Sequence, residues 1–158
     1  MIFRAIAHIL TYNALIMDPS SSEEMDEFLV RCHCGRVQGR FQCSTKTLLV
    51  WDCNCSDCSM RGNVQTVVPR DRFRIDMSEP LEDATILYQW GTKTAVRRFC
   101  KTCGILPWYT PRSDPAGVGI TINCVDWTKG GTRAPPVFDI KKFDGIHFEE
   151  SMEKLAKT

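Results

Sequence analysis

The stretch 53-CNCSDCSMRG-62 places three thiols, those of Cys53, Cys55 and Cys58, within one short segment. Side chains alternate sides in an extended chain, so Cys53 and Cys55 point the same way and can reach one ion together. The polar residues that follow Cys55 favour a turn that brings Cys58 round as a third ligand. The segment therefore predicts a metal site with three thiolate ligands.

The number of ligands bears on what such a site can do. A structural zinc site closes itself with four protein ligands, whereas a catalytic zinc site commonly keeps three and leaves the fourth position to water or substrate. The stretch 53–62 is therefore a candidate for an open zinc site, with Cys53, Cys55 and Cys58 as its catalytic residues.

Two further cysteine pairs frame this stretch, 32-CHCG-35 before it and 100-CKTCG-104 after it. A CxC hairpin and a CxxCG knuckle brought together in space supply four thiolates, the composition expected of structural zinc. Spacing alone leaves open which pairs share an ion, but the most economical interpretation is two zinc ions per chain, one closed and one open. His33 lies between two ligands and would point away from their ion.

The other two cysteines, Cys43 and Cys124, stand alone among strand-forming residues and are expected to be small buried side chains. Disulfides are the alternative interpretation of the whole set. An odd count of nine, tight spacings and the lack of a convincing secretion signal argue for metal instead. We accordingly expect a cytoplasmic protein, or a nuclear one.

The composition of the 158-residue chain, 43% hydrophobic and 25% charged, is that of an ordinary single globular domain. Its formal net charge of +1 gives no reason to expect a nucleic-acid or membrane partner. The apolar opening is interrupted by polar residues before it reaches the roughly 18 residues that a spanning helix needs. We expect residues 1–27 to be a poorly ordered N-terminal extension and linker, and residues 28–158 to be the domain.

The rest of the chain reads as short β-type runs separated by Gly, Pro, Ser and Cys. They cover residues 28–30, 36–41, 47–51, 64–69, 73–75, 85–90, 95–99, 106–109, 118–123 and 137–140. Only the C-terminal stretch has helical periodicity, because Phe148, Met152 and Leu155 recur at four- and three-residue spacing. The expected fold is mainly β, with antiparallel sheets around two zinc sites and a short C-terminal helix.

The motifs CHCG, CNCSDCSMRG and FCKTCG, in that order, resemble the glutathione-dependent formaldehyde-activating enzyme family, and within it the branch that contains centromere protein V. The similarity runs from about residue 30 to about residue 144 and includes 68-VPRDRF-73, 108-WYTPRSDP-115 and 123-NCVD-126. It implies a tent-like fold of antiparallel sheets. It also implies how the ligands divide: structural zinc would be held by Cys32, Cys34, Cys100 and Cys103, and catalytic zinc by Cys53, Cys55 and Cys58.

The family activity implied by this resemblance is the addition of the glutathione thiol to formaldehyde, giving S-hydroxymethylglutathione, formally a carbon-sulfur lyase reaction. The partners are then a small-molecule thiol and an aldehyde. Glutathione carries two carboxylates, so a basic or amide-rich rim is expected around the triad, and the candidate substrate-binding residues are Arg61, Arg112 and Asn123. The bacterial enzymes of the family typically have Arg directly after the third triad cysteine. This chain has Ser59 there, and in this respect it follows the centromere protein V branch.

A second hypothesis is a non-catalytic, zinc-stabilised binding module similar to centromere protein V. An assembly role of that kind would be expected to need interaction segments outside the domain, whereas this chain adds only a short extension that is not notably basic. The sequence thus favours an enzyme. A nucleic-acid-reading zinc ribbon finds no concentrated basic stripe to support it.

Overall fold

A computed structural model describes residues 24–128 and 135–157, and these form two β-sheets. The smaller, four-stranded sheet has the order β10-β1-β2-β5. Its strands are β10 (Val125–Asp126), β1 (Met25–Arg31), β2 (Gln38–Ser44) and β5 (Phe73–Ile75). β1 begins ahead of residue 28, the expected start of the domain, and most of the expected N-terminal extension lies outside the described residues.

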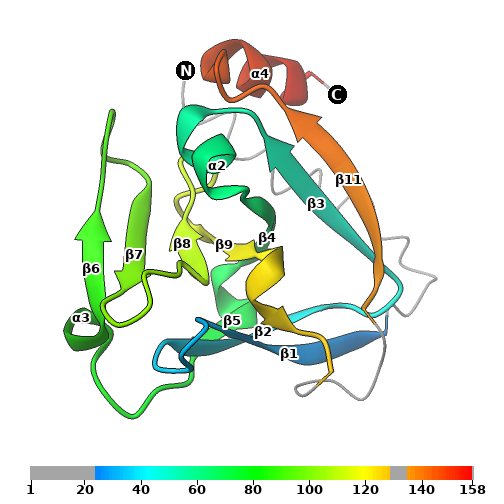
Figure 1. Cartoon of the computed structure of the whole chain (residues 1–158). Coiled ribbons are helices and arrows are strands. Elements are labelled where there is room, and N and C mark those ends of the chain that lie inside the picture. The colour runs from blue at the N-terminus through cyan, green and yellow to red at the C-terminus, as the bar shows by residue number, and fades with distance from the viewer. Residues whose placement is uncertain (1–23, 129–134, 158) are drawn as a thin grey trace.

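The larger, seven-stranded sheet has the order β11-β3-β4-β9-β8-β7-β6. Figure 1 shows it arching from β6 on the left to β11 on the right, above the smaller sheet. Its strands are β11 (Val137–Phe143), β3 (Thr47–Cys53), β4 (Val64–Pro69), β9 (Gly117–Thr121), β8 (Trp108–Thr110), β7 (Val96–Cys100) and β6 (Thr85–Tyr88). The mainly β fold expected from the sequence is therefore confirmed, with strand ends shifted by a few residues.

One strand pair departs from the expected antiparallel arrangement. β11 runs parallel to β3, in a register that places Val137 beside Thr47 and Phe143 beside Cys53. Parallel neighbours need a long crossover connection, which a single sequence does not reveal, because the partner strand lies far away along the chain. The consequence is local: the end of β11 lies against the cysteine that ends β3.

The two faces of the larger sheet have different neighbours. Val118 and Ile120 of β9 and Val50 of β3 are fully buried in the core shared with Phe28 and Phe41 of the smaller sheet. Side chains alternate along a strand, so the neighbours of these residues point to the opposite face. The core thus fills the space between the sheets, and the outer face of the larger sheet is left for other contacts.

The helix α4 (Phe148–Leu155) follows β11, as the apolar periodicity predicted, and forms the top of the molecule in Figure 1. Shorter helical elements were not predicted. They are α2 (Ser56–Arg61), α3 (Leu81–Ala84) and the 3₁₀ turns η1 (Arg70–Arg72) and η2 (Ile122–Cys124). Elements this short contain too few turns to show an apolar period. Among the described residues, no helix is long and apolar enough to pass through a bilayer.

Candidate metal centre

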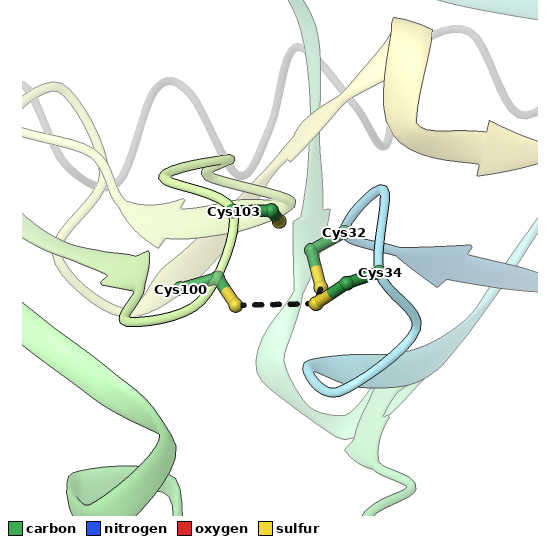
Figure 2. Close-up of side chains that lie close together, drawn as sticks. All are labelled: Cys32, Cys34, Cys100 and Cys103. Atoms are coloured by element: carbon green, nitrogen blue, oxygen red, sulfur yellow. Dashed lines mark hydrogen bonds between the residues drawn. The ribbon is translucent and has the colours of Figure 1, made fainter.

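Four cysteines from two distant loops meet between the sheets. Cys32 and Cys34 lie in the hairpin turn between β1 and β2, and Cys100 ends β7, with Cys103 in the turn that follows. Their Sγ atoms all lie within 4.8 Å of one another. Figure 2 shows the side chains of the two pairs turned toward each other, with Cys34 Sγ and Cys100 Sγ 3.7 Å apart. We call this group the tetrad.

The tetrad has the dimensions of a zinc site. Four thiolates at about 2.3 Å from a tetrahedral ion would lie about 3.8 Å from one another, and Cys32 Sγ lies 3.5 Å from Cys34 Sγ. Burial raises the pKa of the Cys32 thiol to about 12. Burial acts in the same direction on Cys103, but the backbone N–H groups of Cys34 and Ile105 outweigh it and lower the pKa of that thiol to about 6. The tetrad could therefore hold one closed zinc ion.

The second group, which we call the triad, comprises Cys53, Cys55 and Cys58, with Sγ atoms again within 4.8 Å of one another. The contact with the Cys58 thiol lowers the pKa of Cys53 to about 6, and the same contact raises the pKa of Cys58. Within residues 24–128 and 135–157, no fourth Cys, His, Asp or Glu joins the group. Three thiolates fit a zinc ion that keeps one position open.

Helix α2 shapes the triad. The expected turn after Cys55 is in fact a helix, because the segment carries signals for both helix ends. Cys55 is the N-cap and its Sγ accepts the backbone N–H of Cys58 at 3.5 Å. Gly62 ends the helix in the left-handed conformation, with φ of 56°, which glycine adopts at little cost. One helical turn thus places Cys58 beside Cys55.

A buried ion cluster holds α2 against the larger sheet. Asp57 lies between two triad cysteines, and its Oδ2 accepts hydrogen bonds from Arg61 Nη2 at 2.7 Å and from Arg97 Nε at 2.6 Å. The Asp57 and Arg97 side chains are only 10% and 7% exposed. The guanidinium of Arg97 also stacks 5.5 Å from the centre of the Tyr109 ring. The Arg61 pairing has recognisable i,i+4 helical spacing, but nothing in the sequence points to Arg97.

The loop before α4 packs directly on the triad. A Cβ atom at Gly145 would lie 2.5 Å from Cys53 Sγ and 2.9 Å from Cys55 Cβ, so the close approach requires glycine. Asn54 fixes this loop, since its Nδ2 donates to Asp144 Oδ1 at 3.0 Å and its Oδ1 accepts from the backbone N–H of Ile146 at 3.2 Å. Sequence reasoning did not identify Gly145, because it lies far from the triad along the chain.

A cavity of about 160 Å³ opens beside the triad. Its walls come from the outer face of the larger sheet, from the loop after β8 and from α4. The residues that line it are Leu49, Trp51, Cys53, Cys55, Cys58, Gln65, Thr66, Val67, Trp90, Arg97, Tyr109, Pro111, Arg112, Ser113, Asp114, Phe143, Gly145, Phe148, Met152 and Leu155. The periodic apolar residues of the predicted C-terminal helix thus face the candidate site.

Among the polar residues of the cavity lining, Gln65 is held by two hydrogen bonds. Gln65 Oε1 accepts hydrogen bonds from Asn63 Nδ2 at 2.6 Å and from the Tyr109 hydroxyl. Two donors on one oxygen fix the orientation of the Gln65 amide, and Gln65 lines the cavity. Burial raises the pKa of Tyr109, so its hydroxyl stays protonated at neutral pH.

The predicted substrate-binding residues separate into two places. Arg112 lines the cavity of the triad, where it is ion-paired with Glu149 and lies 4.0 Å over the ring of Phe148. Arg61 and Asn123 instead line a second cavity, of about 850 Å³, whose lining contains no triad residue. The second cavity is larger and has Cys32 of the tetrad in its lining, but the triad cysteines line only the first.

The cysteines outside both groups differ in burial. Cys43 of β2 is buried, as expected from its strand context, and burial raises the pKa of its thiol to about 12. Cys124 is only half-buried and packs at the edge of the core, where burial raises its pKa to about 11. All cysteines of the described residues are free thiols.

Comparison with known proteins agrees with the motifs. The family model described as glutathione-dependent formaldehyde-activating enzyme matches residues 27–140. A crystal structure of a Rhodobacter sphaeroides protein is similar, with a TM-score of 0.54 and 27% sequence identity; the match covers 70% of this chain and 98% of that chain. The range that the family model matches, residues 27–140, includes both cysteine groups and ends before Gly145 and α4.

Proposed function

The chain belongs to the glutathione-dependent formaldehyde-activating enzyme family, and on that premise we propose that it is a zinc-dependent carbon-sulfur lyase that joins the thiol of glutathione to formaldehyde. The product is S-hydroxymethylglutathione. The proposal assigns this activity to the domain of residues 28–158. It also places the chain in the cytoplasm or nucleus, where thiols stay reduced, in keeping with its free cysteines.

The observation that carries the proposal is the contrast between the two cysteine groups. The tetrad has the four thiols of a closed structural site, whereas the triad has three and lies on the wall of a cavity. A purely structural role for the triad would not need a cavity beside it. Access for a small molecule is what a catalytic metal site requires.

Cys53, Cys55 and Cys58 would hold a zinc ion with one open position, and this ion would supply ionisation of a thiol or polarisation of a carbonyl. The other roles belong to side chains of this chain. Arg112 lies where it can bind a carboxylate of glutathione. The Gln65 amide nitrogen is a donor for the aldehyde oxygen, and Tyr109 holds that amide in place. The apolar walls exclude water from the reacting atoms.

The direct test is exchange between formaldehyde and S-hydroxymethylglutathione measured by NMR with the zinc-loaded protein, compared with the uncatalysed exchange rate. The account predicts acceleration by the parent protein and a loss of acceleration in Cys55→Ser. Cys124→Ser is the matched control, because that thiol lies outside both groups, and it should retain the parent rate. Exchange at the uncatalysed rate with the fully zinc-loaded parent would refute the proposal.

A second candidate function is a zinc-stabilised binding module, as in the branch of the family that contains centromere protein V. An exposed apolar edge favours it. β6 is the last strand of the larger sheet, and Ile86, Leu87 and Tyr88 expose about half of their surface there. Unpaired sheet edges of this kind can add a strand from another protein. If the parent protein shows no catalysis but binds a partner protein, and Leu87→Lys abolishes that binding, the binding module is favoured over the enzyme.

A further inference from the structure

We propose that the cavity beside the triad takes the apolar substituent of an aldehyde larger than formaldehyde, so that the chain joins thiols to aliphatic or aromatic aldehydes. This inference rests on the proposed function and names the substrate class of the same site. It starts from a mismatch: formaldehyde has no substituent to fill a cavity, and glutathione is a charged tripeptide.

The cavity is lined largely by hydrocarbon. Trp51 of β3 and Phe143 of β11 form one wall, with their ring centres 6.2 Å apart. Phe148, Met152 and Leu155 of α4 form another. Water in such a space finds few hydrogen-bond partners, so apolar atoms that replace it are stabilised there.

The charged groups in the lining are already engaged. Arg97 is bonded to Asp57, and Arg112 is paired with Glu149. Asp114 accepts the backbone N–H of Gly117 at 3.1 Å. Of these, only Arg112 is substantially exposed, at 36%. A carboxylate of the thiol substrate would therefore bind at the rim, near Arg112, and leave the apolar interior to the other substrate.

The size of the cavity sets the size of the substituent. An apolar protein cavity of about 150 Å³ is large enough to bind benzene, and this one measures about 160 Å³. A phenyl ring or a straight chain of comparable volume would fit. The α4 wall follows residue 140, where the family match ends, so it does not come from the part of the chain that the family model describes.

The reaction needs no further reagent. The sulfur of the thiol forms a bond to the carbonyl carbon, and the π electrons of the carbonyl move to its oxygen. That oxygen takes up one proton, which balances the proton that the thiol releases. The product is a hemithioacetal, and nothing is oxidised or reduced.

The first measurement compares kcat/KM for propanal, butanal, pentanal and benzaldehyde with glutathione as the thiol. Each buried methylene should raise kcat/KM about fourfold, the factor that corresponds to about 0.8 kcal/mol per methylene. Met152→Gln, which keeps the length of the side chain but makes the wall polar, should flatten this dependence. Glu153→Gln on the exposed side of α4 is the matched control and should leave it unchanged.

The second measurement does not depend on turnover. Calorimetric titration with benzamide, an unreactive analogue of benzaldehyde, should show binding to the zinc-loaded parent and to Glu153→Gln, and at least tenfold weaker binding to Met152→Gln. Benzamide binding without exchange of formaldehyde would support the apolar site while the proposed function fails. If kcat/KM does not change with the length of the aldehyde and benzamide does not bind, the inference is overturned even where formaldehyde exchange is accelerated. An increase of kcat/KM with the length of an alkyl thiol, and not with the length of the aldehyde, would also overturn it.

Discussion

At the scale of single residues, the triad depends on neighbours that are remote in sequence. Cysteine spacing was sufficient to find the three cysteine motifs, because zinc ligands lie close together in the sequence. It left open which pairs share an ion, and the resemblance to the family implied that division. Gly145 and Arg97 could not be found in this way. They act on the triad across the fold, and a glycine or an arginine carries no signal of such a contact in a single sequence.

Gly145→Ala is expected to weaken zinc binding at the triad by about 10- to 100-fold, the usual range for residues that position metal ligands. The added Cβ would lie 2.5 Å from Cys53 Sγ, so the thiol must move. Zinc competition with a chromophoric chelator measures this change. Ile146→Ala, at an exposed neighbour, should bind zinc like the parent, and equal affinities for the two variants would contradict the account.

Asp57→Asn is expected to lower the free energy of unfolding by about 3–5 kcal/mol, because it leaves two largely buried guanidinium groups without their carboxylate. Urea denaturation measures the change. Asp52→Asn removes a carboxylate from an exposed ion pair with Lys142, so it should cost less than about 1 kcal/mol. Similar costs for the two variants would show that the Asp57 cluster does not hold α2.

At the scale of elements, the C-terminal helix was predictable and its neighbours were less so. The four- and three-residue spacing of Phe148, Met152 and Leu155 is enough to indicate a helix with one apolar face. The parallel pairing of β11 with β3 and the short helix α2 were not predicted. The strand pairing joins segments that are far apart in the sequence, and the helix is set by capping within a few residues, so neither leaves a periodic pattern.

An ion pair between His147 and Asp144 lies at the N-terminus of α4. The hydrogen bond that His147 Nδ1 donates to Asp144 Oδ2, at 2.8 Å, raises the pKa of His147 above its ordinary value of 6.5. Hydrogen bonds from His147 and Asn54 lower the pKa of Asp144 to about 2, so its carboxylate stays charged. Because the His147 pKa is raised on folding, the stabilisation is complete below pH 6.5 and is lost as pH rises through the folded-state value.

NMR titration of the His147 ring should therefore give a pKa above 6.5 in the parent and a lower one in Asp144→Asn. Glu153→Gln, elsewhere on α4, should leave the titration unchanged. A His147 pKa at or below 6.5 in the parent would show that the pair with Asp144 does not help to hold α4.

At the scale of the whole molecule, the tetrad joins the two sheets. Cys32 and Cys34 follow a strand of the smaller sheet, and Cys100 ends a strand of the larger one. Four thiolates on one ion would cross-link these distant segments, and structural zinc contributes its binding free energy to folding. The cysteine motifs of the sequence indicated that such a cross-link could form, and the resemblance to the family implied which pairs form it. Only the folded structure shows which sheets this cross-link joins.

Cys100→Ser is expected to unfold the domain or to destabilise it by several kcal/mol, a part of the roughly 10–16 kcal/mol with which structural zinc binds. Thermal melts followed by circular dichroism measure the loss. Cys124→Ser serves as the control for loss of a thiol outside both groups. Superposed melts of parent and Cys100→Ser would rule out a structural tetrad.

We infer that the tetrad holds the fold and that the triad is an open site with a separate role. Zinc content per chain and circular dichroism of Cys55→Ser, measured on one sample, test it most directly. Serine is a good N-cap residue, so this variant removes a thiol from the start of α2 without uncapping the helix. The account predicts about two zinc ions in the parent, about one in Cys55→Ser, and native spectra for both. Unfolding of Cys55→Ser as complete as that of Cys100→Ser would contradict it.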